Sequence, residues 1–380
     1  MAKITKIIIG IIIVVIIIAG IWYGISKKQT PSSEKEPIKI GAILPLSGSG
    51  SYLGEQLRDG ILIAQEEINK NGGIKGRLVD VIFEDSKGDP KEAVTVFNDL
   101  ILRENPQAVI VAFSAPTLAL IPLAENQKIP LISTITSAPG ITNKGNYIFR
   151  IFTTSEIDAP VIAKYAIDFL SLKNFGVLYM NDDYGLSYYE SFKKTIESKG
   201  GKIVGAETFT RSDADFKTQL LKLKEKNPEA IYVVGLDSHY ITIFKQAKDL
   251  KLNQILLGNW ILASPNVIQK MGNTLDGSYF TTPLYYLETP QGKSTIFNAK
   301  YQEKFNKTAD AYSAFGYDTL MIIAEAAKLK GVSREGIYEG LLNIAYDGLL
   351  GNLSFDKDRE VNFQLYPATI KNGKLEVLNF

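Results

Sequence analysis

A regular alternation of strand-like and helix-like segments, which begins at residue 38, constrains the fold of this chain more than any other feature. The apolar runs "IKIGAIL", "LVDVIFED", "AVIVAF" and "IPLIS" are typical of strands, and amphipathic stretches separate them. The rhythm restarts at "FGVLYM" and recurs at "KIVGAETF", "AIYVVG" and "QILLGN". Such alternation predicts parallel sheets with helices on both faces. We therefore expect an α/β fold with two Rossmann-like lobes, one before about Ile151 and one after it.

The helix-like stretches carry their own local signals. Apolar residues recur at helical spacing on one face of the first stretch: Leu57, Ile61, Ala64 and Ile68. In the next, "DPKE" at residues 89–92 supplies an N-cap aspartate, a proline at the first helical position and a capping-box glutamate. From Gly348 onward the pattern changes to short strands and turns.

Length and composition exclude several classes of protein. A chain of 380 residues is too long for one ordinary core, which indicates two domains. A net charge of +1 and an apolar content of 45% give no sign of a nucleic-acid partner. The sequence has no cysteine, so disulfides, thiolate metal sites and a cysteine nucleophile are excluded.

The first 28 residues differ from the rest of the chain. Residues 7–25 are 19 uncharged, mostly Ile and Val residues, and as a helix they would span about 28 Å, close to the hydrocarbon thickness of a bilayer. A cleaved signal peptide would have a shorter apolar run and an A-x-A-like site, whereas Trp22 and Tyr23 suit a membrane interface. We predict a single-pass N-terminal transmembrane helix at residues 1–28, followed by a polar linker at 29–37.

Ligands of open parallel sheets bind beyond the carboxyl ends of the strands, so the loops after the strands are the informative ones. Two of them carry Ser/Thr clusters, at Ser114 and at residues 133–137. Each cluster alone is more often a helix cap than a site, but two in successive turns of one sheet favour a shared ligand. The loop "SGSGSYLG" is either a mobile turn or a lip of the cleft, with Tyr52 or Leu53 covering the ligand.

Motifs for catalysis are missing from the sequence. "SGSGSYLG" is neither a P-loop nor a dinucleotide fingerprint, and no G-x-S-x-G elbow occurs. The one histidine, His239, is expected to be a solvated residue near a helix start. No metal cluster has plausible spacing, while hydrolysis by paired carboxylates stays open without positive support. We expect a protein that is not an enzyme and carries no cofactor or metal.

The segment "IKIGAILPLSGSGSYLGEQLRDGILIAQEEINKNGGIKGRLVDVIFEDSKGDPKEAV" resembles the start of type I periplasmic binding proteins of the branched-chain amino acid group. These are receptors of ABC importers for leucine, isoleucine, valine and related ligands. "FSAPTLA", "ISTITSAP", "NDDYG" and "DAYSAFGYDTL" are also similar to that family, in its order and spacing, and the resemblance covers about residues 38–378. It implies two lobes that close on a ligand about a hinge of three crossings, near 150–155, 279–285 and 346–351. Lobe 1 would be 38–152 plus 284–348, and lobe 2 would be 153–283 plus 349–380.

The resemblance also implies ligand-binding positions. Ser114, Ser137 and the backbone of Ile135 would hold the carboxylate of an amino acid. Tyr184 would close over the ligand from the second lobe, and Tyr312 would form a pocket wall. The positions that hold the ammonium in amino-acid-binding members correspond here to Ser155 and Trp260, neither of which is anionic. Either Glu156 or Asp237 substitutes, or the ligand lacks an ammonium group, since a buried ammonium without an acceptor is costly.

The function that the resemblance implies is an extracytoplasmic, membrane-anchored solute-binding protein. It would bind a small ligand, such as a branched-chain or other amino acid, or a related amide or carboxylate, between the lobes. The permease subunits of an ABC importer would be its partners. The alternative is a ligand-sensing receptor domain of the same fold, but only about six residues precede the predicted anchor, which favours transport.

Overall fold

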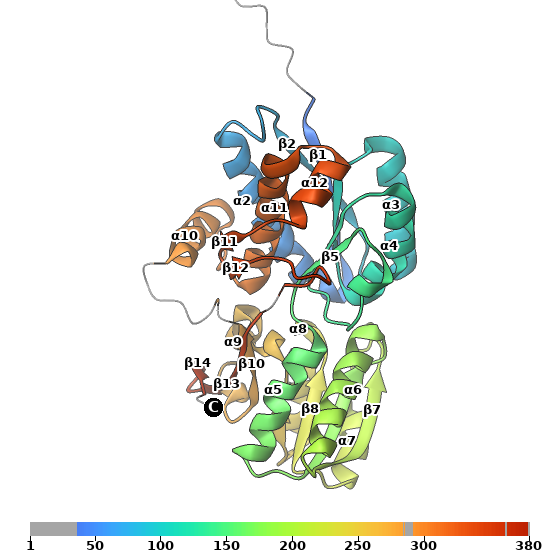
Figure 1. The fold of residues 1–380 in the computed structure, drawn as a ribbon. Helices are drawn as coiled ribbons and strands as arrows, with labels where there is room; N and C mark the ends of the chain where they lie inside the picture. Colours follow the sequence, from blue (N-terminus) through green and yellow to red (C-terminus); the bar gives the residue numbers. More distant parts are fainter. Residues whose placement is uncertain (1–35, 284, 286–291, 362, 379–380) are drawn as a thin grey trace, which may run out of the picture.

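The computed structural model describes residues 36–283, 285, 292–361 and 363–378. The predicted membrane anchor at 1–28 and most of the linker at 29–37 lie outside these residues. Within the described part, no helix combines the length and the apolar character needed to cross a membrane. The chain forms two α/β lobes, each built on its own mainly parallel sheet (Figure 1).

Lobe 1 is built on a five-stranded parallel sheet in the order β2-β1-β3-β4-β5. Its strands are β1 (Ile38–Leu44), β2 (Val79–Asp85), β3 (Ala108–Ala112), β4 (Leu131–Thr134) and β5 (Ile148–Ile151). Its helices are α2 (Ser51–Lys70), α3 (Pro90–Glu104), α4 (Ser114–Gln127) and, from late in the chain, α10 (Lys293–Phe305), α11 (Ala311–Lys330) and α12 (Arg334–Leu341). Short 3-10 turns are η1 (Gly48–Gly50) and η2 (Thr142–Lys144). The helices α3 and α4 cover one face of this sheet, and α2 and α11 cover the other.

Lobe 2 is built on a seven-stranded sheet in the order β14-β13-β10-β9-β8-β6-β7. Its strands are β6 (Asn174–Met180), β7 (Lys202–Phe209), β8 (Ala230–Val234), β9 (Ile255–Leu257), β10 (Tyr279–Pro283), β13 (Leu365–Lys371) and β14 (Lys374–Val377). Its helical segments are α5 (Ser155–Asp168), α6 (Asp183–Ser198), α7 (Lys217–Glu225), α8 (Asp237–Asp249), η3 (Trp260–Ala263), α9 (Pro265–Met271) and η4 (Gly272–Leu275). The last two strands pair antiparallel, β13 with β10 and β14 with β13.

Most local signals in the sequence act as expected, but Glu92 does not complete the predicted capping box. Its side chain pairs with Lys87, and the amide of Asp89 donates to the carbonyl of Ser86. Asp89 caps α3 by accepting hydrogen bonds from the amides of Lys91 and Glu92, with Pro90 at the first helical position. The apolar face predicted for α2 is buried in the core. Strands β3 and β8 are buried along their whole length, because helices cover both faces of a doubly wound sheet.

The chain passes between the lobes at 152–154, after β5, and again between β10 and α10. The predicted third crossing at 346–351 is wrong. Those residues belong to a hairpin of β11 (Tyr346–Gly348) and β12 (Gly351–Leu353) that is held on α11 of lobe 1. Asp318 of α11 accepts hydrogen bonds from the amides of Leu349 and Leu350 at 3.0 and 2.8 Å.

The return segment after this hairpin also stays with lobe 1. The amide of Arg150 in β5 donates to the carbonyl of Arg359, and the amide of Val361 donates to the carbonyl of Arg150. The chain joins the second sheet only at β13, so the third crossing lies between 361 and 365. Residues 349–361 therefore pack with lobe 1, not with lobe 2 as expected.

A cavity between the two lobes

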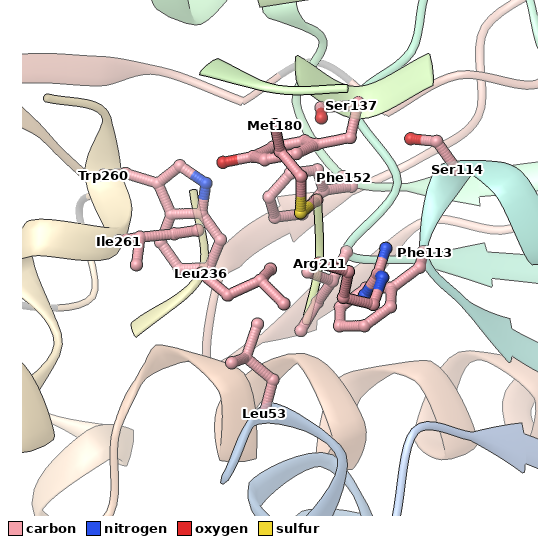
Figure 2. Close-up of a pocket in the computed structure, with 12 residues that line it drawn as sticks. Leu53, Phe113, Ser114, Ser137, Phe152, Met180, Arg211, Leu236, Trp260 and Ile261 are labelled. Atoms are coloured by element: carbon pink, nitrogen blue, oxygen red, sulfur yellow. The ribbon is translucent and has the colours of Figure 1, made fainter. Parts of the chain in front are cut away.

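A small cavity with only about 20 Å³ of free volume lies between the carboxyl ends of the two sheets (Figure 2). Both lobes line it, and its free volume is well below that of typical small-molecule sites, about 300–1,000 Å³. The lining residues are Leu53, Phe113, Ser114, Ile135, Ser137, Phe152, Met180, Tyr184, Arg211, Leu236, Trp260 and Ile261. Six of the eleven residues singled out from the sequence are among them.

The lobe 1 wall has an unusual backbone. Phe113 and Ile135, which directly follow β3 and β4, have φ angles of 73° and 49°. Positive φ is uncommon for large side chains, and for Ile it is a genuine outlier. Phe113 combines it with a ψ of 147°, a conformation that is costly for any residue other than glycine. Both strained residues line the cavity, and the residues that follow them include its two serines.

The two Ser/Thr clusters meet at this wall. The hydroxyl oxygen of Ser114 accepts a hydrogen bond from the amide of Ala138 at 3.2 Å, which joins the loop after β3 to the loop after β4. Behind the wall, the hydroxyl of Thr117 lies 3.3 Å from those of Ser133 and Thr136. The clusters therefore divide into an inner network that supports the loops and two serines, Ser114 and Ser137, that line the cavity.

Helix α4 begins at the same wall, and no side chain caps its N-terminus. The amides of Ser114 and Ala115 lie in the first turn, where they have no intrahelical partner. Free amides and a helix dipole favour a negative charge at this end. The wall thus offers two hydroxyls and a helix N-terminus from one lobe.

Aromatic rings form the opposite wall. Trp260 is only 2% exposed, and its ring lies 5.2 Å from that of Phe152 and 4.8 Å from that of Tyr312, measured between centroids. The indole Nε1 is buried without a hydrogen-bond partner in the structure. Buried polar groups are seldom left unpaired, so this donor stands out.

Tyr184 lines the cavity with its ring, but its hydroxyl belongs to lobe 2. The hydroxyl donates to the carbonyl of Gly235 at 3.1 Å and accepts from Nδ2 of Asn259 at 2.7 Å. Burial raises the pKa of Tyr184 well above its ordinary value, so the hydroxyl stays neutral. In this state Tyr184 contributes an apolar surface and a rigid position.

Arg211, which the sequence analysis did not single out, reaches the cavity from the loop after β7. Its Nη2 pairs with the carboxylate of Asp182 at 3.0 Å, and its guanidinium lies 5.0 Å from the ring centre of Phe113 in lobe 1. Its Nη1 is buried without a hydrogen-bond partner. Arg211 therefore spans the two lobes at the cavity with one donor unused.

His239 holds the backbone of Arg211, and the prediction that it is solvated is wrong. The side chain is 2% exposed, and its Nδ1 accepts from the amide of Leu236 at 3.1 Å while its Nε2 lies 3.0 Å from the carbonyl of Arg211. These contacts require the neutral ring with the proton on Nε2. Burial is the largest cause that lowers the pKa of His239, to about 4.

Five residues singled out from the sequence lie outside the cavity lining: Tyr52, Ser155, Glu156, Asp237 and Tyr312. The hydroxyl of Tyr52 donates to Asp310 at 2.8 Å, and the hydroxyl of Tyr312 donates to Asp237 at 3.3 Å. Ser155 is fully buried at the start of α5, where its amide donates to the carbonyl of Ser137 at 2.9 Å. Tyr52, Tyr312 and Ser155 support the cavity from behind.

The suggested carboxyl partners of an ammonium are not free in the cavity. Asp237 also accepts from the hydroxyl of Ser264 at 3.2 Å, and Glu156, the other suggested ammonium partner, is exposed on α5. Desolvation, with a smaller contribution from Asp310, raises the pKa of Asp237 to about 8, so the carboxyl is protonated near pH 7. Neither residue is placed as a charged partner for a ligand in the cavity.

The lining residues that the sequence analysis missed are mostly apolar and lie at or just beyond the ends of strands: Phe113, Phe152, Met180, Arg211, Leu236 and Ile261. The same rule that pointed to the loop after β3 applies to the loop after β7, so Arg211 could have been found. The apolar lining residues could not have been found, because a Leu or Met at the end of a strand cannot be told from a core residue by sequence. Among the described residues, no group of three or more His, Asp or Glu side chains could hold a metal ion.

The sequence model of the family described as periplasmic binding protein matches residues 37–374, which is most of the chain. The chain belongs to the periplasmic binding protein family. Its members are solute-binding proteins rather than enzymes, and the two-lobed α/β fold with a cavity between the lobes agrees with this membership.

Individual relatives are similar over most of their length. The leucine-, isoleucine-, valine-, threonine- and alanine-binding protein of Pseudomonas aeruginosa is 27% identical over 330 residues, which cover 86% of this chain and 87% of the relative. The substrate-binding protein LivJ from Streptococcus pneumoniae, whose crystal structure contains isoleucine, is 28% identical in sequence with a TM-score of 0.82. The match covers 90% of this chain and 99% of LivJ. A solute-binding protein from Rhodopseudomonas palustris in complex with benzoate shares the fold at 20% identity, with a TM-score of 0.83 and coverage of 90% and 95%.

Proposed function

We propose that this chain is the solute-binding subunit of an ABC importer and captures a small amphiphilic carboxylate between its lobes. The observation that carries the proposal is the cavity itself, which has hydroxyls and a helix N-terminus on one wall and aromatic rings on the other. Relatives named for binding leucine, isoleucine and valine support a solute of this size and character.

The two walls divide the recognition of such a solute. Ser114, Ser137 and the first amides of α4 would bind the carboxylate, because hydrogen bonds to a charged acceptor are the strong ones. Phe152, Trp260 and the ring of Tyr184 would cover the apolar part. A solute that contacts both lobes favours the closed arrangement over the open one by the difference in its affinity for the two.

We also propose that residues 1–28 anchor the protein in the cell membrane, with the lobes on the extracytoplasmic side and the permease subunits as neighbours. The 19 uncharged residues at 7–25 support this proposal. Washing membranes with alkaline carbonate tests it: an anchored chain stays in the membrane pellet, and a peripheral or cleaved one is released.

Thermal unfolding of the full chain in mild detergent tests the function. Amino acids, 2-oxo acids and simple aliphatic or aromatic acids would be screened, and a bound solute raises Tm because it stabilises only the native state. For the carboxylate that gives the largest shift, the double variant S114A/S137A should lose at least about tenfold in affinity, since each hydrogen bond to a charged group contributes about 1.5–3 kcal/mol.

The matched control is Ser133→Ala, which removes a hydroxyl of the inner network next to the same wall but not in the cavity lining. This variant should lower Tm without changing the shift that the solute causes. If S114A/S137A kept the full shift, the two serines would not hold the solute, and the proposed site would have to be abandoned.

A further inference from the structure

The polar groups that line the cavity are hydrogen-bond donors without a carboxylate among them. The lining residues that the structure describes include two serines, a tyrosine, an arginine and a tryptophan, and no Asp or Glu. A free amino acid brings an ammonium group as well as a carboxylate into such a site. Burying that ammonium without an anionic or well-placed acceptor is costly.

Two of these donors have no partner in the structure. Nη1 of Arg211 and Nε1 of Trp260 are both buried, and both residues line the cavity. Trp260 is 2% exposed, so water does not reach its ring edge from the surface. A buried donor without a partner is unfavourable, so a bound acceptor would stabilise it. Both donors belong to lobe 2, whereas the serines belong to lobe 1.

Three carboxyl groups of lobe 2, those of Asp158, Asp182 and Asp237, already have hydrogen-bond partners within the protein. Asp182 accepts from the amide of Gly185 with one oxygen and pairs with Arg211 through the other. Asp158 accepts from the hydroxyls of Tyr188 and Thr281 at 2.6 and 2.5 Å. Neither residue lines the cavity, nor does Asp237 with its own partners Ser264 and Tyr312. An ammonium in the cavity would therefore find no carboxylate among the lining residues as its counter-charge.

We infer that the solute is an apolar carboxylate without an ammonium group, selected by Arg211 and Trp260 in addition to the two serines. The inference rests on the proposed function and names its substrate class. An anion matches the donors of both walls, and Nη1 of Arg211 is a charged donor that the pair with Asp182 leaves unused. Aliphatic and aromatic monocarboxylic acids, including 2-oxo acids, meet this description.

Matched pairs of ligands test the inference on the full chain in mild detergent. Calorimetry would compare 4-methylpentanoate and 4-methyl-2-oxopentanoate with L-leucine, and 3-phenylpropanoate with L-phenylalanine. In at least one pair the acid should bind at least about 100-fold more tightly than the amino acid, because a buried unpaired charge is strongly unfavourable. Amino acids that bind as tightly as the acids would overturn the inference and leave the proposed function intact.

Variants of Arg211 separate its charge from its structural role. R211Q should weaken binding of the acid about tenfold or more, while binding of the uncharged 4-methylpentanamide changes by less than about threefold. Because R211Q leaves Asp182 unpaired, the double variant D182N/R211Q is measured beside it, and the asparagine can still cap α6. The control is Lys87→Gln, which removes an exposed lysine paired with Glu92 and should change neither affinity.

The remaining outcomes are also decisive. Equal losses for acid and amide in both Arg211 variants would show that the residue only shapes the loop, which contradicts its role in selection. W260F keeps an aromatic ring but removes Nε1 together with part of the indole, so an unchanged affinity for the 2-oxo acid would show that Trp260 does not select the solute. If neither acids nor amino acids bind the wild-type chain, the carboxylate site fails and the proposed function fails with it.

Discussion

Two large apolar residues at the cavity adopt backbone conformations that are unfavourable for their side chains. Phe113 and Ile135 adopt positive φ although neither is a glycine, and both lie where a strand gives way to the cavity wall. Strained residues persist only where the surrounding structure determines them, and they cluster at functional sites. No local sequence pattern predicts such a conformation, because the strain is imposed by tertiary packing.

His239 supports the loop of Arg211 and should make stability depend on pH. Its folded-state pKa is about 4 and its ordinary value is about 6.5, so the unfolded chain binds its proton first as pH falls. The free energy of unfolding should therefore decrease between about pH 6.5 and pH 4, by up to about 1.4 kcal/mol per pH unit from this group. Above pH 6.5 the histidine does not change how the free energy of unfolding depends on pH.

Urea unfolding of the wild type and His239→Gln across this range measures the contribution of the histidine. The buried carboxyls of Asp237 and Asp310 act in the opposite direction, because their pKa values are raised to about 8 and about 7. They are common to both proteins, so the difference between the two curves isolates the histidine, with Asp213 and Arg211 as its charged neighbours. A difference that stayed constant from pH 7 to pH 4 would contradict a buried, neutral His239.

At the scale of elements, the alternation of strands and helices was sufficient to predict both sheets, and the cap at Asp89 was sufficient to place the start of α3. The position of the third crossing could not be predicted from the sequence pattern, because Tyr346–Gly348 could form a strand in either lobe. A single carboxylate, that of Asp318, holds the following turn on α11. Gly348 permits this contact, since a Cβ there would lie 2.5 Å from the carboxylate of Asp318.

The loop after β4 depends on an ion pair with the return segment. Arg150, whose side chain is 1% exposed, pairs with Glu360 through two hydrogen bonds of 2.6 Å and donates to the carbonyl of Ala138 at 2.5 Å. The guanidinium thus connects a segment more than 200 residues away in sequence to the loop that carries Ser137. The sequence offers no signal for this pair, because both residues look like ordinary surface charges.

Breaking this pair should destabilise the protein and loosen the serine wall together. Glu360→Gln leaves a buried arginine without its counter-charge, which should lower the free energy of unfolding by about 3 kcal/mol and weaken solute binding. The control is Asp358→Asn, two residues away in an exposed pair with Lys357, which should cost less than about 0.5 kcal/mol. Urea unfolding and calorimetry measure both effects, and equal stability of the two variants would rule out a structural role for the pair.

At the scale of the whole molecule, the lobes meet through few polar contacts around a shared apolar centre. One cluster of buried apolar residues runs from lobe 1 past the cavity into lobe 2 and includes Phe152 and Trp260. The polar contacts between the lobes include Ser238 to the carbonyl of Ser49 at 3.3 Å and Tyr312 to Asp237 at 3.3 Å. An interface of this kind is sensitive to what fills the cavity, because a solute adds contacts to both sides at once.

Closure can be followed chemically because the chain has no cysteine of its own. In S49C/S238C the only two thiols lie at a contact between the lobes, where the side chain of residue 238 reaches the backbone carbonyl of residue 49. A solute that favours closure should speed disulfide formation by its effect on the closed population. Both positions are at least partly exposed, so the oxidant reaches them in either state. The single variant S238C reports any cross-link between molecules, and mass spectrometry of the oxidised chain gives the rate. Cross-linking at the same rate with and without a saturating solute would mean that the solute does not close the lobes, although it could still bind to one of them.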